Sequence, residues 1–420
     1  MRRPYIYVVI GKNFGDEGKG LAVDYLAMQN PEERTLVIRH NGGAQSGHTV
    51  DLPEKRFVFH ELSSGSFRGA DTLWADTYFP DLYKLGEELE DFRALAGFVP
   101  RIYAQPGAQI TLIDDVLLNM AAEEARGATR HGSCGMGIYE AQLRGEAGFA
   151  ITLDELIRMN RAELVERLQE IRAKYLPDRL QALNLSKGSL GEYGELLKDT
   201  NVLINVATQI LENLDYVQPV ENMAQFMNGY EQVIFENGQG LLLDSENETF
   251  TPHVTASRTG LHHPCAFLKR YDLWPDEVIY VTRSFVTRHG AGPLPYECSR
   301  EELGIIQPDA TNVENPWQGR LRFARHGTVE EFVLPVTEDL QVLKEYQMPM
   351  PCRSLMITHL NETGGSIVMQ DQECPVEEFC RNTRIKQHFD KFYLSASPYA
   401  TGLEVINSWE ECLLGNCDMS

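Results

Sequence analysis

The chain has 420 residues, of which 61 are acidic and 38 are basic, so its formal net charge is −23. Hydrophobic residues make up 43% of the chain and charged residues 24%, as in folded proteins with a sizeable core. This composition excludes a fully disordered chain, a collagen and a coiled-coil rod. The negative charge also argues against nucleic acid as a partner, because a phosphate backbone requires a basic face. Any phosphate ligand must therefore be held by a few local groups.

Neither a membrane segment nor a metal-binding cysteine pattern is predicted. No stretch approaches 18 uninterrupted apolar residues, and the apolar run after Arg2 and Arg3 is too short for a signal peptide. The eight cysteines are scattered without a CxxC pair, a spacing that fits neither a zinc site nor a disulfide framework. We therefore expect reduced thiols, a cytoplasmic location and no membrane partner.

The first fifty residues predict a strand, a loop, a helix and a second strand. Residues 5–10 form a β-branched and aromatic run, a glycine-rich loop fills 11–20, and residues 21–29 are apolar on one side. Pro31 closes the helix, and residues 36–38 begin a strand that leads into a second glycine-rich turn at 41–48. This order is the building unit of a parallel α/β sheet.

Four later segments resemble the first strand. Each is short and apolar, and each leads into a polar or glycine-rich loop: residues 232–235, 278–281, 355–357 and 392–394. Because the ligand crevice of a parallel sheet lies at the carboxyl ends of its strands, we expect all six loops to meet at one site.

The predicted fold is a single intertwined α/β domain over residues 1–420. We expect a mostly parallel central sheet with flanking helices and a phosphate loop similar to a P-loop. Residues 162–175 have the apolar spacing of a helix, and we expect a helical insertion at about 153–225.

The first loop is a variant of the Walker phosphate loop, GxxxxGK[ST]. Gly18 and Lys19 are present, but Gly11 lies two positions too far upstream and Gly20 replaces the metal-binding hydroxyl. The inserted residues include Asp16, whose carboxylate is a ligand that magnesium prefers. The alternative is a glycine-rich turn with a surface Asp-Glu pair. A position between a buried strand and a helix N-terminus favours phosphate binding.

The second loop ends in Gly47-His48-Thr49. A single histidine is usually structural, but His48 follows the second strand of the same unit and should face the first loop. We therefore predict an acid–base pair of Asp16 and His48 beside a bound phosphate.

Four motifs together resemble the adenylosuccinate synthetase family, which joins IMP to aspartate at the expense of GTP. They lie at residues 15–20, 42–49, 235–244 and 287–293, and they occur in family order along almost the whole chain. By this resemblance, Asp16 removes the N1 proton of the purine so that O6 attacks the γ-phosphoryl group. Lys19, His48 and Mg²⁺ neutralise the developing charge, and Gln239 positions the base.

The resemblance also implies a set of binding residues. The triphosphate is expected to contact Gly15, Glu17, Gly18, Lys19, Gly20, Gly47, His48, Thr49, His359, Asn361 and Ser397. The purine monophosphate is expected to contact Asp16, Asn41, Gln45, Ser133, Arg144, Gln239, Thr255 and His289. Thr311, Arg320 and Arg322 are expected to bind the amino acid, and Asp16 with the Gly47 carbonyl to hold Mg²⁺. Arg144 resembles the arginine that reaches into a neighbouring subunit, which implies a homodimer.

Two departures from the family concern the phosphoryl donor and the amine. The family reads guanine with Thr-Lys-x-Asp, whereas residues 358–361 read Thr-His-Leu-Asn. The amide of Asn361 cannot accept both guanine protons, so the donor is either GTP or ATP. Pro316 and Trp317 stand where the family has small residues and threonines, so the amine is aspartate or a related compound.

A third departure concerns the nucleotide. Residues 255–258, Thr-Ala-Ser-Arg, are similar to the phage relatives that act on dGMP, but those relatives lack the catalytic carboxylate that this chain keeps as Asp16. IMP is therefore favoured, and His289 leaves the choice of sugar open. The predicted function is an NTP-dependent carbon–nitrogen ligase that forms adenylosuccinate from IMP and aspartate. The alternatives are a paralogue that joins another amine or a dGMP-like nucleotide, and a catalytically silent nucleotide sensor.

Overall fold

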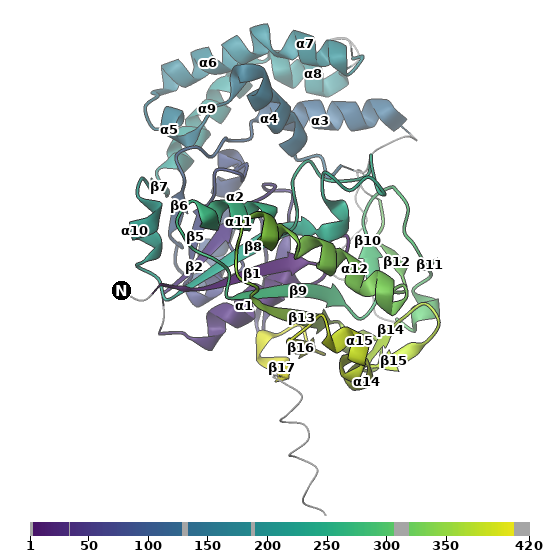
Figure 1. The fold of residues 1–420 in the computed structure, drawn as a ribbon. Coiled ribbons are helices and arrows are strands. Elements are labelled where there is room, and N and C mark those ends of the chain that lie inside the picture. The colour runs from purple at the N-terminus through teal and green to yellow at the C-terminus, as the bar shows by residue number, and fades with distance from the viewer. Residues whose placement is uncertain (1–2, 33, 128–132, 186–189, 306–318, 407–420) are drawn as a thin grey trace, which may run out of the picture.

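The computed structural model describes residues 3–32, 34–127, 133–185, 190–305 and 319–406. Within them, ten strands form one twisted sheet at the centre of the molecule (Figure 1). Its spatial order is β17 (Leu403–Ile406), β16 (Lys391–Ser395), β13 (Cys352–Thr358), β9 (Glu277–Arg283), β1 (Tyr5–Gly11), β8 (Gln232–Gly240), β2 (Thr35–Arg39), β5 (Asp71–Trp74), β6 (Ile102–Ala104) and β7 (Val217–Pro219). Neighbouring strands run parallel except β16 and β17. The predicted fold class is confirmed.

The central strand β1 is buried on both faces. Ile6 and Val8 pack into the largest hydrophobic core, whereas Val9 faces the opposite side and packs against Ala22 of α1 (Lys19–Gln29). Burial on both faces explains why residues 5–10 are an uninterrupted apolar run. The six strands predicted from such runs are all confirmed, as β1, β2, β8, β9, β13 and β16.

The order of the sheet places the carboxyl end of β1 at a topological switch point. Strand β1 lies between β8 and β9. The chain leaves β1 through α1 toward β2 on one side, while β9, β13 and β16 lie on the other. A crevice for ligands is expected outside the strand ends at such a reversal.

Seven helices form a layer beyond the carboxyl ends of the strands (Figure 1). They are α3 (Ile113–Arg126), α4 (Ile138–Arg144), α5 (Leu153–Leu156), α6 (Arg161–Lys174), α7 (Leu176–Ala182), α8 (Gly191–Lys198) and α9 (Thr200–Leu214). Residues 162–175 were predicted to be helical, and α6 confirms this. The insertion predicted at 153–225 differs in two ways. The layer begins earlier, with α3, and β7 inside the predicted range pairs with β6 in the main sheet.

The remaining elements surround the sheet. The helices are α2 (Leu82–Ala96), α10 (Met223–Met227), α11 (His262–Lys269), α12 (Val329–Asp339), α13 (Val342–Glu345), α14 (Val376–Arg381) and α15 (Thr383–Lys386). Three small sheets pair β3 (His48–Leu52) with β4 (Lys55–Phe59), β12 (Arg322–Ala324) with β10 (Val286–Arg288) and β11 (Glu297–Cys298), and β14 (Ser366–Val368) with β15 (Glu373–Pro375). In the part of the chain that the structure describes, no helix has the length and apolar character needed to cross a membrane.

Candidate active site

A cleft of about 1120 Å³ opens at the carboxyl ends of the strands. All six predicted loops contribute to its lining, through Asp16, His48, Gln239, His289, His359 and Ser397 among others. The opposite wall comes from the helical layer, through residues of α3, α4 and α7. The expectation that loops up to about 390 positions apart meet at one site is therefore confirmed.

The loop between β1 and α1 has the shape of a phosphate-binding loop. Gly15, Asp16 and Gly18 adopt left-handed backbone conformations, with φ of 95°, 61° and 99°. Helix α1 begins directly afterwards, at Lys19, and no side chain caps its N-terminus. An N-terminus of this kind presents backbone N–H groups and a positive dipole end, which bind phosphate.

Glu17 holds this loop together from inside. Its Oε1 accepts hydrogen bonds from the backbone N–H groups of Asn13 (3.0 Å) and Gly15 (2.8 Å). Its Oε2 lies 2.8 Å from Nζ of Lys19, and both side chains are buried. Burial opposes ionisation, but the Lys19 ammonium holds the pKa of Glu17 below its usual value. Lys19 lines the cleft whereas Glu17 does not, so the predicted triphosphate contact of Glu17 is corrected to a role in loop structure.

Asp16 lies at the floor of the cleft. Its backbone carbonyl accepts a 2.6 Å hydrogen bond from Nε of Arg283. This bond restrains the backbone turn that carries the Asp16 side chain. Its carboxylate Oδ2 is 3.7 Å from Nε2 of His289. Two residues predicted to touch the purine nucleotide are thus adjacent. Arg283 was missed, although its position two residues after the predicted strand at 278–281 was a usable signal.

His48 begins β3 and is held by a buried carboxylate. Its Nδ1 lies 2.6 Å from Oε1 of Glu236, which is fully buried in the middle of β8. Burial lowers the pKa of His48. Burial alone would raise the pKa of Glu236, but its contacts with His48 and Arg39 lower it to about 2. Glu236 belongs to a motif singled out in the sequence, yet its role was not predicted.

Gln239 and Gln45 line the cleft as predicted. Oε1 of Gln239 accepts a 3.5 Å hydrogen bond from Nδ2 of Asn41, and Oδ1 of Asn41 accepts a 2.9 Å bond from the backbone N–H of Gly238. Asn41 is buried and does not line the cleft, so it supports Gln239 from behind and is corrected from a direct purine contact. Nε2 of Gln45 is buried with no partner among the described residues, which leaves it available to a ligand.

The remaining predicted triphosphate residues also line the cleft. Gly20, Thr49, Asn361 and Ser397 line it together with His359, whose φ of 60° is left-handed. Nδ1 of His359 is 2.8 Å from Oγ1 of Thr358. Thr255 and Gly47 line the same cleft.

The helical wall contributes one predicted residue, Ser133, and several charged residues that were not predicted. Ser133, predicted as a phosphate contact, lines the cleft and donates a 2.8 Å hydrogen bond to Asn119 of α3. Glu140 of α4 also lines it and accepts a 2.6 Å bond from Nε of Arg179 in α7. Glu123 and Arg126 of α3 contact each other at the same wall. These charges come from ordinary amphipathic helices, which carry no local signal of a binding site.

The prediction for Arg144 is wrong in this structure. Its side chain is fully buried in its own chain, where Nε and Nη2 each lie 3.0 Å from the Asp115 carboxylate. Nη1 and Nη2 also donate to the carbonyls of Phe149 (2.7 Å) and Ile110 (2.8 Å). All of these contacts are with groups of the same chain. The homodimer stays a prediction, without Arg144 to support it.

The two described residues of the predicted amino-acid site, Arg320 and Arg322, do not line the cleft. Arg322 pairs with Glu297 at 2.8 Å and donates to the carbonyls of Gly290 (3.2 Å) and Gly292 (2.7 Å). Arg320 is exposed on the surface, and neither arginine lines the cleft. Thr311 lies outside the described residues, as do Pro316 and Trp317.

The predicted magnesium ligands fit the ion's chemistry. Asp16 and Gly47 both line the cleft beside the phosphate loop. In the described ranges, no group of three or more His, Cys, Asp or Glu side chains is arranged as a metal site. Magnesium is commonly held by one or two carboxylates together with water and substrate phosphates, so a single carboxylate facing a phosphate cleft suits it.

Comparison with known proteins identifies the family and the fold. The family model described as adenylosuccinate synthetase matches residues 8–347. The chain is similar in structure to a fully ligated adenylosuccinate synthetase from Plasmodium falciparum, with a TM-score of 0.66 and 18% identity over 95% of this chain and 99% of that one. It is also similar to the cyanophage S-2L succinoaminodeoxyadenylate synthetase bound to dGMP and to dATP as an energy donor. That TM-score is 0.62, with 15% identity over 99% of this chain and 98% of the other. The family match spans most of the chain, which therefore belongs to the adenylosuccinate synthetase family of carbon–nitrogen ligases of purine biosynthesis.

Proposed function

We propose that this protein phosphorylates the 6-oxygen of IMP and then replaces the phosphate with the amino group of aspartate, forming adenylosuccinate. The observation that carries this proposal is the convergence of Asp16, Lys19, His48 and Gln239 on one cleft at the switch point of the sheet. A carboxylate, a phosphate loop, a histidine and an amide are the groups that such a reaction requires.

The first step is the removal of the N1 proton of the purine. Asp16 accepts this proton, which places negative charge on O6 and makes that oxygen a nucleophile. Gln239 holds the ring, since its amide can donate to one ring atom and accept from another. The bond from Asn41 orients the Gln239 amide for this purpose.

The second step transfers the γ-phosphoryl group to O6, with the nucleoside diphosphate as leaving group. The backbone N–H groups at the start of α1 and the Lys19 ammonium bind the phosphates. Lys19 can divide its donors between Glu17 and a phosphate, because an ammonium has three. His48 faces the same phosphates from β3. Magnesium, held by Asp16 and the Gly47 carbonyl, would supply charge neutralisation at the triphosphate when bound.

In the last step the amine of aspartate attacks C6 and inorganic phosphate departs with its oxygen. The amine loses a proton as the carbon–nitrogen bond forms. We expect Arg320 and Arg322 to act on the aspartate carboxylates only if they approach the cleft when substrate binds, because guanidinium groups suit carboxylates.

Asn361 supports ATP over GTP as the donor. Guanine presents two protons, at N1 and at the 2-amino group, and an amide has one accepting oxygen. Adenine presents an acceptor at N1 and a donor at N6, which match the amide donor and acceptor. Asn361 lines the cleft, where its amide could distinguish the adenine of ATP from the guanine of GTP.

Asp16 supports IMP over dGMP as the acceptor. A carboxylate beside N1 leaves little room for a 2-amino group and would be placed to accept the N1 proton. The cyanophage relative bound to dGMP makes the alternative a specific one to test.

The test is a matrix of phosphate-release assays on the full chain with magnesium. ATP and GTP are compared as donors, IMP and dGMP as acceptors, and all common amino acids as amines, with the 6-substituted purine identified by mass. We expect turnover with ATP, IMP and aspartate, its loss with EDTA, and its return with added magnesium. Absence of phosphate release and of any 6-substituted purine in every combination would refute the ligase proposal.

A further inference from the structure

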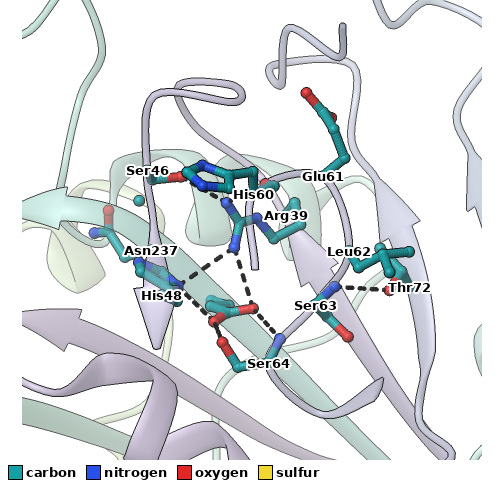
Figure 2. Close-up of polar contacts among 12 residues, drawn as sticks. Arg39, Ser46, His48, His60, Glu61, Leu62, Ser63, Ser64, Thr72 and Asn237 are labelled. Atoms are coloured by element: carbon teal, nitrogen blue, oxygen red, sulfur yellow. Dashed lines mark hydrogen bonds and ion pairs between the residues drawn. The ribbon is translucent and has the colours of Figure 1, made fainter. Parts of the chain in front are cut away.

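Glu236 is a fully buried carboxylate beside the cleft. Its Oε1 lies 2.6 Å from Nδ1 of His48 and also accepts a hydrogen bond from the Ser64 hydroxyl. Its Oε2 lies 3.4 Å from Nη1 of Arg39 and accepts a 3.2 Å bond from the Ser64 backbone N–H. Figure 2 shows Arg39, His48 and Ser64 gathered at this point, with Glu61 pointing away from it.

The sheet register places this carboxylate. Strands β2 and β8 are parallel, and Arg39, the last residue of β2, is paired in register with Glu236 in the middle of β8. In-register residues on neighbouring strands point to the same face. Arg39 is fixed independently, since its Nη2 donates to Oγ of Ser46 (2.6 Å) and to the carbonyl of His60 (2.9 Å).

These contacts decide which nitrogen of His48 carries the proton. An ionised carboxylate only accepts hydrogen bonds, so at 2.6 Å Nδ1 must be the donor. Nη1 of Arg39 is 3.3 Å from the same Nδ1, but a guanidinium only donates and cannot pair with a protonated nitrogen. Arg39 therefore restrains the carboxylate and not the imidazole.

The other ring nitrogen remains for a ligand. Nε2 of His48 is buried and has no hydrogen-bond partner among the described residues, although His48 lines the cleft. A buried polar atom without a partner is unfavourable, and a ligand atom or an ordered water would supply the missing hydrogen bond. Lys19 and the N-terminus of α1 lie on the same side of the cleft, so the ligand expected there is a phosphate group.

We propose that Glu236 is a positioning residue for the phosphoryl transfer. It accepts the Nδ1 proton of His48, locks the ring in that tautomer and directs Nε2 at the phosphoryl donor. The tautomer and the ring orientation follow from the contacts alone, whereas the identity of the ligand rests on the proposed function.

Glu236→Gln tests the tautomer without changing the size of the side chain. Oε2 faces two groups that only donate, Arg39 and the Ser64 N–H, so the amide oxygen must occupy its position. The amide NH₂ then replaces Oε1 and donates to Nδ1 of His48. We expect the variant to hold His48 with its proton on Nε2 and the wild type to hold it on Nδ1.

The two tautomers have distinct signatures in two-bond ¹H–¹⁵N NMR spectra of histidine-labelled protein, with His48 assigned from its substitution by Gln. The matched control is Glu61→Gln, which changes an equally buried glutamate whose acceptor contacts are with Tyr78 and Asp81. That control should leave the His48 signals unchanged. A wild-type proton on Nε2, or equal shifts in the two variants, would overturn the proposal whether or not the protein proves to be a ligase.

The kinetic consequence is a fall in kcat with little change in the KM for IMP. Loss of a partner that orients a functional histidine typically costs about 10–100-fold. We expect Glu236→Gln to lose activity in that range, Glu236→Asp to recover part of it, and Glu61→Gln to stay within about threefold of wild type. Thermal melts of all three establish that they fold. Equal losses in Glu236→Gln and Glu61→Gln with the wild-type tautomer kept in both would show a merely structural role.

Discussion

The two walls of the cleft use their charged residues differently. At the strand ends, polar groups keep bonding capacity: Nε2 of His48 and Nε2 of Gln45 have no partner among the described residues. In the helical layer, charged groups are saturated by one another, as in the bidentate pair of Arg144 with Asp115 and that of Arg172 with Asp114, at 2.7 Å for both bonds. The strand ends are therefore equipped to bind ligands and the helical layer to hold its own shape. Substitutions at the first should cost turnover, and substitutions in the second should cost stability.

The largest effect is expected for Asp16→Asn. Asn tolerates the left-handed backbone of this position, so the loop should keep its shape. Loss of the base should lower kcat by about 10²–10⁴-fold while nucleotide binding, measured by calorimetry, is retained. Asp51→Asn, another cleft carboxylate, is the matched control and should change kcat only a few-fold. Activity of Asp16→Asn close to wild type would favour a role in sensing or another mechanism.

Arg144→Met tests whether a substitution in the helical layer lowers stability and not turnover. It leaves Asp115 buried and unpaired, which typically destabilises a fold by about 3–5 kcal/mol. Chemical denaturation should show this loss, with kcat of the folded fraction little changed. The double variant Asp115→Leu/Arg144→Met should be more stable than the single one, since no uncompensated charge remains. A selective loss of kcat in Arg144→Met would instead return Arg144 to the active site.

Lys12, which directly follows β1, predicts that the stability of the fold depends on pH. It is buried, with Nζ 3.2 Å from Oδ1 of Asn13 and 3.8 Å from the centre of the Phe332 ring. Burial lowers the pKa of Lys12 to about 7, although Glu17 opposes the shift. Above pH 7 the folded state thus binds fewer protons than the unfolded state, so the destabilising effect of burying Lys12 declines as pH rises toward the unfolded pKa of lysine.

Lys12→Met should therefore be more stable than wild type at neutral pH, and this advantage should shrink by roughly 3 kcal/mol between pH 7 and pH 9.5. Denaturation curves at both pH values measure it, with Lys198→Met on the exposed surface as the control. An advantage that is independent of pH would mean that Lys12 stays charged in the fold.

The smallest effect is expected at the start of α6. The Asn160 side chain accepts hydrogen bonds from the backbone N–H groups of Ala162 (2.9 Å) and Glu163 (3.2 Å). In turn, the Glu163 carboxylate accepts a hydrogen bond from the backbone N–H of Asn160. Asn160→Ala should cost about 1 kcal/mol of unfolding free energy without altering kcat. A change in turnover would show that the helical layer is coupled to the chemistry.

Much of the strand-end wall was predictable because its signals are local. A buried parallel strand must be a short apolar run, and a phosphate loop needs glycines between such a run and a helix. Residues 5–20 satisfy both conditions within one window of sequence. For this reason the sequence predicted that Asp16, Lys19 and His48 would meet, and all three line the cleft. Asn41 and Glu17 were predicted to contact ligand, but both are buried behind residues that line the cleft. Sequence order does not tell which of two neighbouring polar side chains faces the cleft.

By itself, then, the sequence determined the strands, the phosphate loop and the family. Only the tertiary structure decided the partners of each charge. Glu236 orients His48 across 188 positions, and Arg144 pairs with Asp115 inside its own chain. Strands, helices and tight loops depend on residues close together in sequence, so their patterns can be recognised in the chain. A hydrogen bond between distant residues depends on sheet register and helix packing, which are established only on folding.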